Sequence, residues 1–203
     1  STPWSGIDPI MATAELIESL NTIVSRRINI INNPAVVSVG LVKAGTRNNI
    51  IPEDAQIMGT IRTFDPLLRK QIYEEIEQIA KGVALGTGTE ISVEFDVGGF
   101  YPVTFNEPKL VNAMKGSLME ASPGRFYESN IPVTGAEDFS YFSQEVPGMY
   151  FWLGINKPGV GLESANFGER TDVAGNHSPY FYVDDSALDL SLIHISEPTR
   201  PSL

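Results

Sequence analysis

One of the two histidines of this chain, His177, lies in the segment NHSPYF (176–181), at the end of a long glycine-rich loop. A neutral imidazole is a good zinc ligand, and loops after buried strands often carry the sites of α/β proteins. A catalytic zinc needs about three protein ligands, yet the chain contains no HxH, HExxH or HxD pattern. His177 is therefore either a hydrogen-bonded surface side chain or a metal ligand whose partners lie outside this chain.

Two other groups of residues have types suited to chemistry. The adjacent acids Glu137 and Asp138 can serve as base and ligand, but acids are also favoured at the start of a helix by its dipole, and we favour that interpretation. Arg62 lies within GTIRTF (59–64), where a guanidinium is either exposed on a sheet face or bound to a carboxylate. The glycine-rich segments lack phosphate-loop spacing, so nothing indicates a nucleotide site.

Composition limits the possible partners. The chain has 203 residues, a formal net charge of −11 and no cysteine. Phosphates repel so acidic a protein, so we expect neither nucleic acid nor a membrane as a partner. No apolar run approaches the roughly 18–20 residues of a membrane span. Thiolate metal sites and disulfides are excluded, and the composition favours a protein that handles small molecules.

Two helices are predicted in the first hundred residues. Asp8-Pro9 and Asp65-Pro66 each place a capping residue before a proline at the first helical position. The helices are expected over 10–26 and from 66 to about 83. Their expected core positions are Ile10, Ala14, Ile17, Leu20 and Val24 in the first helix, and Leu68, Ile72, Ile76, Ile79 and Val83 in the second.

Three strands are predicted around these helices, at 35–42, 55–64 and 91–97. The order is helix, strand, strand, helix, strand. One strand before residue 1 would complete a βαββαβ ferredoxin-like sandwich, and we expect the chain to begin after that strand.

The remaining residues have the pattern of a partial α/β unit. We expect Asn106 to cap a helix with apolar positions Leu110, Met114 and Leu118, and a short strand near 131–133. The run PGMYFWLGI (147–155) suits a strand buried on both faces. Residues 190–203, which contain His194, are similar to a translated sequencing adapter, and we exclude them from the fold as a non-native tail.

Six motifs together resemble one family, the di-zinc amidohydrolases that include aminoacylases, hippurate hydrolases and carboxypeptidase-G-like enzymes (metallopeptidase family twenty). They occur in family order over nearly the whole chain to about residue 189. The motifs are PWSGIDPI (3–10), NNIIPEDA (48–55), GTIRTFD (59–65), GAEDFS (135–140), PGMYFWLG (147–154) and NHSPYF (176–181).

The resemblance implies an α+β fold in two domains. Residues 1–98 would be a ferredoxin-like lid and dimerisation domain without its first strand. Residues 99–189 would be the C-terminal portion of an α/β zinc-exopeptidase catalytic domain. His177 would be a zinc ligand, and Asn49 and Arg62 would hold the carboxylate of the substrate when the lid closes.

The same resemblance implies the chemistry of the whole enzyme. Two Zn²⁺ per complete subunit, or Mn²⁺ or Co²⁺, would activate a water that hydrolyses N-acyl amino acids or similar peptide-like amides. We expect a homodimer formed through the lid and favour the cytoplasm as its location. No catalytic residue falls within this chain, and the lid histidine that relatives offer to a partner would fall just before Ser1, so we expect the chain alone to be inactive. The alternative is a non-catalytic ferredoxin-like module that binds amino acids or dimerises.

Overall fold

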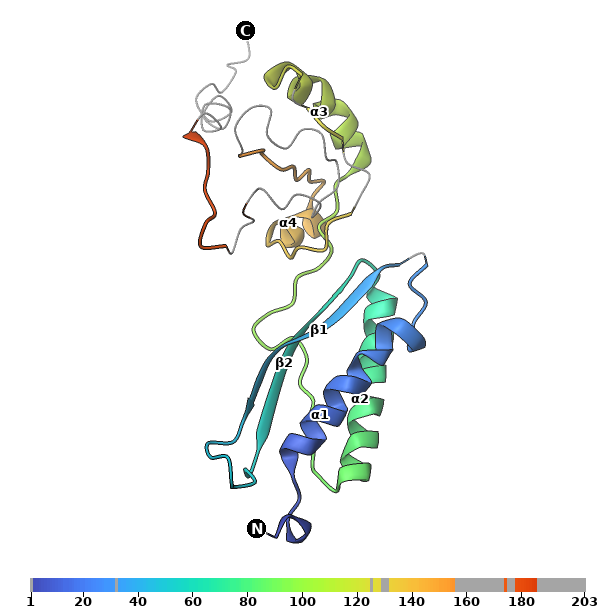
Figure 1. The fold of residues 1–203 in the computed structure, drawn as a ribbon. Coiled ribbons are helices and arrows are strands. Elements are labelled where there is room, and N and C mark those ends of the chain that lie inside the picture. The colour runs from blue at the N-terminus through green and yellow to red at the C-terminus, as the bar shows by residue number, and fades with distance from the viewer. Residues whose placement is uncertain are drawn as a thin grey trace. The chain divides into compact units, whose positions relative to one another are not determined.

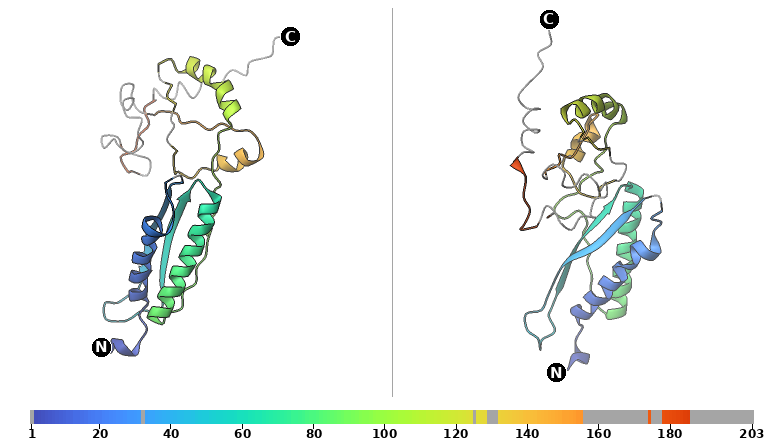
Figure 2. Two further views of the ribbon diagram at one scale, coloured as in Figure 1. Left: turned by 90° about the vertical axis from the view of Figure 1, so that its right-hand side faces the viewer. Right: turned by 45° about the horizontal axis from the view of Figure 1, so that its top comes forward.

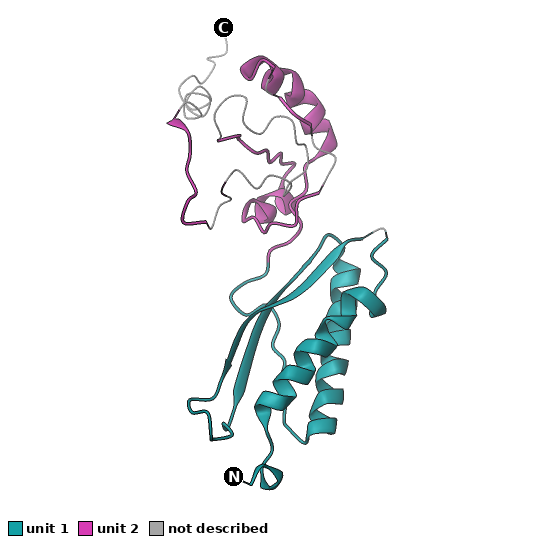
Figure 3. Ribbon diagram, in the orientation of Figure 1, with its two compact units in different colours: residues 1–100 teal, residues 101–203 magenta. Residues whose placement is uncertain are grey.

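The computed structural model of the protein describes residues 2–31, 33–124, 126–128, 132–155, 174 and 178–185. The chain divides into two compact units, residues 1–100 and 101–203 (Figure 3). Within the described ranges, no helix has the length and apolar character needed to cross a membrane. The elements, in order, are η1 (Pro3–Ser5), α1 (Pro9–Leu20), η2 (Ile23–Arg27), β1 (Ala35–Ala44), β2 (Ala55–Thr63), α2 (Pro66–Thr87), α3 (Pro108–Ala121) and α4 (Phe139–Glu145).

The two helix starts predicted in the first unit are confirmed. A carboxylate oxygen of Asp8 accepts a hydrogen bond from the backbone N–H of Ile10 at 2.9 Å, and Asp65 accepts one from Leu67 at 2.8 Å. Each satisfies a backbone donor that has no partner inside the helix. Helix α2 ends where Gly88 takes a positive φ of 73°, a conformation that glycine adopts without strain.

Helix α1 is shorter than the predicted helix, and of its predicted core positions only Leu20 is fully buried. The helix ends at Leu20 and is followed by the π-helical turn η2. Ala12, Leu20 and Ile23 are buried, whereas the predicted core positions Ile10 and Ala14 are exposed. Two apolar stripes of α1 have helical spacing, and only packing against the rest of the unit selects one of them.

The first unit is a two-stranded antiparallel hairpin with α1 and α2 side by side on one face (Figures 1 and 2). The register shifts between Val39 and Leu41, which leaves Gly40 as a bulge. A side chain at Gly59 would collide with the carbonyl oxygen of Ser38, so glycine is needed beside the bulge. The buried apolar core consists of Ala12, Leu20, Ile23, Ala35, Leu68, Ile72, Ile79 and Val83, and it confirms the predicted face of α2.

The predicted strand at 91–97 is wrong. The segment has the expected alternation from Ile91 to Asp96, because every second residue is half-buried. Ile91 packs against the core, and the ring of Phe95 stacks on Tyr73 at 4.0 Å. However, a strand is defined by hydrogen bonds to a neighbour, and the described residues form only the β1–β2 pair. They therefore show the helix, strand, strand, helix part of a ferredoxin-like order without its four-stranded sheet.

In the second unit, Asn106 binds a backbone rather than capping a helix. Its side-chain amide donates to the carbonyl of Tyr150 at 2.9 Å and accepts from the N–H of Tyr150 at 2.6 Å. The cap of α3 is Glu107, whose carboxylate accepts from Leu110 at 2.7 Å. The amide of Asn106 thus reproduces the hydrogen bonds of a neighbouring strand and fixes the segment before α3 to Tyr150.

The predicted doubly buried strand at 147–155 is also wrong, because these residues have no strand assignment in the described structure. Phe151 and Trp152 are 51% and 59% exposed. Exposed apolar side chains of this kind are expected on a surface that packs against further protein. The short strand predicted near 131–133 lies partly outside the described residues, and residues 132 and 133 are not in a strand.

A pH-dependent contact in the first unit can be tested by Tyr73→Phe. The Tyr73 hydroxyl donates to Asp96 at 2.7 Å, and burial, together with this bond, raises its pKa to about 12. The folded state therefore holds the proton more tightly than the unfolded chain, whose tyrosine pKa is about 10. The contribution of this protonated hydroxyl to the stability of the folded state is complete below about pH 10, and it is lost as the pH rises through about 12.

We expect Tyr73→Phe to lower the free energy of unfolding at neutral pH by about 1 kcal/mol or less, and to reduce the loss of stability at alkaline pH. Urea denaturation measures both effects. Tyr127→Phe is the control, because the exposed Tyr127 makes no side-chain hydrogen bond among the described residues. Equal alkaline loss in the wild type and Tyr73→Phe would contradict the role of this bond.

Candidate functional site

Asn49 lies in the turn that joins β1 to β2, at the same end of the first unit as the N-terminal turn (Figures 1 and 2). The two turns border an open surface cavity of about 510 Å³. Two of the motifs, PWSGIDPI and NNIIPEDA, thus meet at one place although some 40 residues separate them along the chain. The cavity is lined by Thr2, Pro3, Ser5, Gly6, Asp8, Ile10, Arg47, Asn48, Asn49, Ile50 and Ile51.

The cavity carries donors on one side and an acid on the other. Arg47, Asn48 and Asn49 come from the hairpin turn, and Asp8 comes from the start of α1. The guanidinium of Arg47 makes no hydrogen bond or ion pair with the described part of the chain. Asp8 already uses one carboxylate oxygen as the cap of α1. An open cation beside two amides is an arrangement that binds carboxylates.

Arg62 lies at the opposite end of the hairpin. It occupies the penultimate position of β2, opposite Val36, and is half-buried. Arg62 lies seven positions after Ala55, and a strand rises about 3.3 Å per residue, which gives about 23 Å. The hairpin turn that carries Asn49 lies before Ala55, so the structure does not bring Asn49 and Arg62 together within one chain.

Glu137 and Asp138 stand directly before α4, as expected of acids at a helix start. Asp138 occupies the cap position without a side-chain capping bond. The carboxylate of Glu137 instead accepts a hydrogen bond of 2.8 Å from the hydroxyl of Tyr150. This bond holds the pKa of Glu137 below its usual range and raises the pKa of Tyr150. The pair links the start of α4 to the segment that follows it.

The described residues do not make a metal site. No group of three or more histidine, aspartate, glutamate or cysteine side chains is suitably placed among them. His177, the predicted zinc ligand, and the tail 190–203 lie outside the described residues. Since a catalytic metal needs about three protein ligands, the described residues do not form a complete metal site by themselves.

Sequence reasoning missed two residues. Arg47 precedes the asparagine pair, and its position in a polar turn was the only available signal. Tyr150 lies in an apolar run and gave no signal, because its hydroxyl finds Glu137 only in the folded unit.

Known proteins are similar to this chain over most of its length. The model of the peptidase family M20/M25/M40 matches residues 15–188. The chain is 38% identical over 154 residues to the N-acetyldiaminopimelate deacetylase of Leuconostoc mesenteroides, and this alignment covers 76% of this chain and 39% of that protein. It is 32% identical over 195 residues to the N-acetylcysteine deacetylase of Bacillus subtilis, and this alignment covers 96% of this chain and 46% of that protein.

A solved structure shows the same similarity. The crystal structure of the Bacillus subtilis YXEP protein, a dinuclear metal-binding peptidase of the M20 family, matches with a TM-score of 0.62 and 28% identity. The match covers 91% of this chain and 43% of that one. The chain therefore spans less than half the length of the relatives it matches.

The contact between Glu137 and Tyr150 can be tested by Tyr150→Phe. A lowered pKa means that the ionised Glu137 stabilises the folded state above its unfolded pKa, and that this contribution is lost as the pH falls through the lowered value. We expect Tyr150→Phe to be less stable than the wild type at neutral pH, with the difference disappearing in acid. Chemical denaturation at both pH values measures it, with Tyr101→Phe as the control. A difference that is independent of pH would contradict the proposed ionic character of the bond.

Proposed function

Because the chain belongs to the peptidase family M20/M25/M40, we propose that it is part of an amidohydrolase that cleaves a small N-acyl amino acid. The observation that carries this proposal is the family match over residues 15–188. Two relatives that cover three quarters or more of the chain are deacetylases of N-acetylated amino acids. An acyl group on the amino nitrogen and a free carboxylate are the features that such substrates share.

Because the protein is acidic, a substrate that bears a carboxylate can bind only where dedicated cations are present. A net charge of −11 repels anions on average. Arg62 on β2 and the amide of Asn49 in the hairpin turn are the groups proposed to hold the carboxylate. A guanidinium binds a carboxylate through two parallel hydrogen bonds, and an amide adds a further donor.

The proposed enzyme is metal-dependent, with two zinc ions in the complete subunit and manganese or cobalt as alternatives. The proposed contribution of this chain is His177, and its support is the family membership and the resemblance of NHSPYF to the family's metal-ligand motif. The M20 relative of known structure binds a dinuclear metal. The remaining ligands would come from protein that this chain does not contain.

We further propose that the carboxylate site is shared between two copies of the lid in a homodimer. Asn49 lies before Ala55, and the stretch of β2 from Ala55 to Arg62 spans about 23 Å, so one lid cannot offer both Asn49 and Arg62 to a single carboxylate. Two copies related by a twofold axis can bring the hairpin turn of one chain to the Arg62 end of the other. Strand β1 supports this assembly, because only β2 pairs with it among the described residues, and an open edge can pair with a second copy.

The amidohydrolase proposal is tested by complementation. The chain is mixed with the portion of the Bacillus subtilis deacetylase that it does not cover, and with Zn²⁺. We expect hydrolysis of N-acetyl amino acids, and we expect His177→Ala to reduce it at least 100-fold, in line with the loss of a metal ligand. His194→Ala is the matched control and should have no effect. A folded mixture that binds zinc through His177 but hydrolyses nothing would favour the non-catalytic module.

The shared carboxylate site is tested by mixing two inactive variants of the complemented enzyme, Asn49→Ala and Arg62→Ala. If the two residues act from different chains, half of the sites in mixed dimers are intact, and statistical exchange restores about a quarter of wild-type activity. If they act from one chain, every site lacks one of them and mixing restores nothing. Sedimentation velocity confirms that the variants dimerise as the wild type does.

A further inference from the structure

We propose that Arg69 of α2 is a latch for the end of the first unit: its guanidinium holds Phe100 and thereby locks the turn 96–99. The adjacent glycines Gly98 and Gly99 are of the residue type expected in a flexible hinge, and they lie just before the boundary between the two units. In this proposal the glycines are rigid, and the chain bends only after Phe100. The inference does not depend on the proposed function, because every contact of the latch lies within the first unit.

The first argument is the backbone of the turn. The N–H of Gly99 donates to the carbonyl oxygen of Asp96 at 3.1 Å, which closes a four-residue turn. Asp96, Gly98 and Gly99 have positive φ angles of 58°, 89° and 115°. Aspartate tolerates the left-handed region, and only glycine adopts the wider values without strain. The shape of the turn therefore accounts for the two glycines, and their presence does not require mobility.

The second argument is that aromatic contacts hold both sides of the turn on α2. Before the turn, the ring of Phe95 stacks on Tyr73 with centroids 4.0 Å apart and planes 4° from parallel, and the Tyr73 hydroxyl donates to Asp96 at 2.7 Å. After the turn, the guanidinium carbon of Arg69 lies 3.8 Å from the centroid of the Phe100 ring. The face of an aromatic ring attracts a cation. Arg69 and Tyr73 are four residues apart on α2 and so lie on one face of it, which fixes both arms of the turn to the same helix.

The third argument is that aromatic rings are the partners of Arg69. Its Nη1 atom is buried without a hydrogen-bond partner, and within the part of the chain that the structure describes Arg69 forms no ion pair. Its guanidinium carbon also lies 5.8 Å from the centroid of the Tyr73 ring. A buried donor without an acceptor costs free energy, and the aromatic faces offset part of that cost. Moving Phe100 away would let water reach the guanidinium, so the latch holds the turn and can still be released.

The chain is held again soon after Phe100. In the second unit, the side-chain amide of Gln144 donates to the carbonyl oxygen of Val103 at 3.2 Å. Tyr101 and Pro102 are the residues between these two attachments. Proline fixes its own φ near −65° and restricts the residue before it. The proposal thus assigns the bend of the connection to the backbone of these two residues rather than to the glycines.

The experiment follows the turn in the full chain by nuclear magnetic resonance. The heteronuclear Overhauser effect of Gly98 and Gly99 reports fast backbone motion, and exchange of the Gly99 N–H with water reports opening of the turn. In the wild type we expect both glycines to be as rigid as α2. Arg69→Ala should speed the exchange of the Gly99 N–H by about fivefold or more. Glycines as mobile in the wild type as a frayed terminus would overturn the proposal.

Two further variants separate the latch from general packing. Arg69→Lys keeps the charge without the flat guanidinium and should exchange at an intermediate rate. Phe100→Leu keeps an apolar side chain without the ring and should resemble Arg69→Ala. Lys70→Ala is the matched control, because Lys70 is the next cation on α2, is exposed and lies over no ring in the described ranges. Wild-type exchange in both Arg69→Ala and Phe100→Leu would refute the latch. Arg69 lies outside the buried core, so its variants should fold, and the dispersion of the amide spectrum verifies this.

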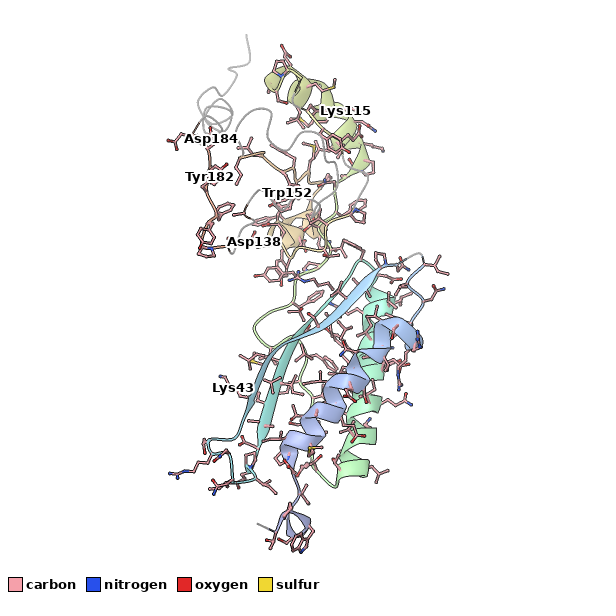
Figure 4. The ribbon with its side chains drawn as sticks, viewed as in Figure 1. Lys43, Lys115, Asp138, Trp152, Tyr182 and Asp184 are labelled. Atoms are coloured by element: carbon pink, nitrogen blue, oxygen red, sulfur yellow. The ribbon has the colours of Figure 1, made fainter. Side chains whose placement is uncertain are left out.

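A second measurement tests where the chain bends. The chain contains no cysteine, so Lys43→Cys and Lys109→Cys allow one spin label in each unit. Lys43 is an exposed residue of β1 that projects away from the helices (Figure 4), and Lys109 is exposed on α3. Adding Arg69→Ala should widen the distribution of distances between the labels, because the released glycines become a second point of bending. A distribution of unchanged width would contradict the assignment of the bend.

Discussion

The β1–β2 hairpin acts as a rigid spacer that keeps the turn with Asn49 and the strand end with Arg62 at opposite ends of the first unit. A paired strand has a fixed rise of about 3.3 Å per residue, so the turn after β1 and the last residues of β2 cannot approach each other. The packing of α1 and α2 on one face holds the hairpin in place. Ile23 and Ile72 are fully inaccessible at the centre of that packing, so bending the hairpin would expose buried apolar surface. The first unit therefore has two chemically different ends rather than one site.

This separation decides which polar groups a single copy of the first unit can bring together. At the turn, Arg47 and Asn49 lie opposite Asp8 around one cavity. At the other end, Arg62 lies half-buried on β2. In a protein with a net charge of −11, an anionic ligand binds only where local cations outweigh the average field. Arg47 lies at one end of the first unit and Arg62 at the other, and the hairpin keeps the two cations apart.

The second unit is held by polar contacts more than by a described sheet. The amide of Asn106 makes two hydrogen bonds to the backbone of Tyr150, and the Tyr150 hydroxyl reaches Glu137. Together they connect Asn106, two residues before α3, to Tyr150 and to the start of α4. The rings of Phe151 and Trp152 in this segment stay exposed. Specific hydrogen bonds order the segment, while its apolar surface remains available for contact with other protein.

The sequence by itself determined the features that depend on local chemistry. Asp8-Pro9 and Asp65-Pro66 start helices because the capping oxygen and the proline act within three residues, and the motif order revealed the family. Only the tertiary structure decided which stripe of α1 is buried, that 91–97 and 147–155 are not strands, and that Asn106 binds Tyr150. Strand pairing and stripe selection depend on what lies beside a segment in space, which periodicity does not encode. For the same reason the meeting of Arg47 with the N-terminal turn, and the distance of Arg62 from both, followed from packing alone.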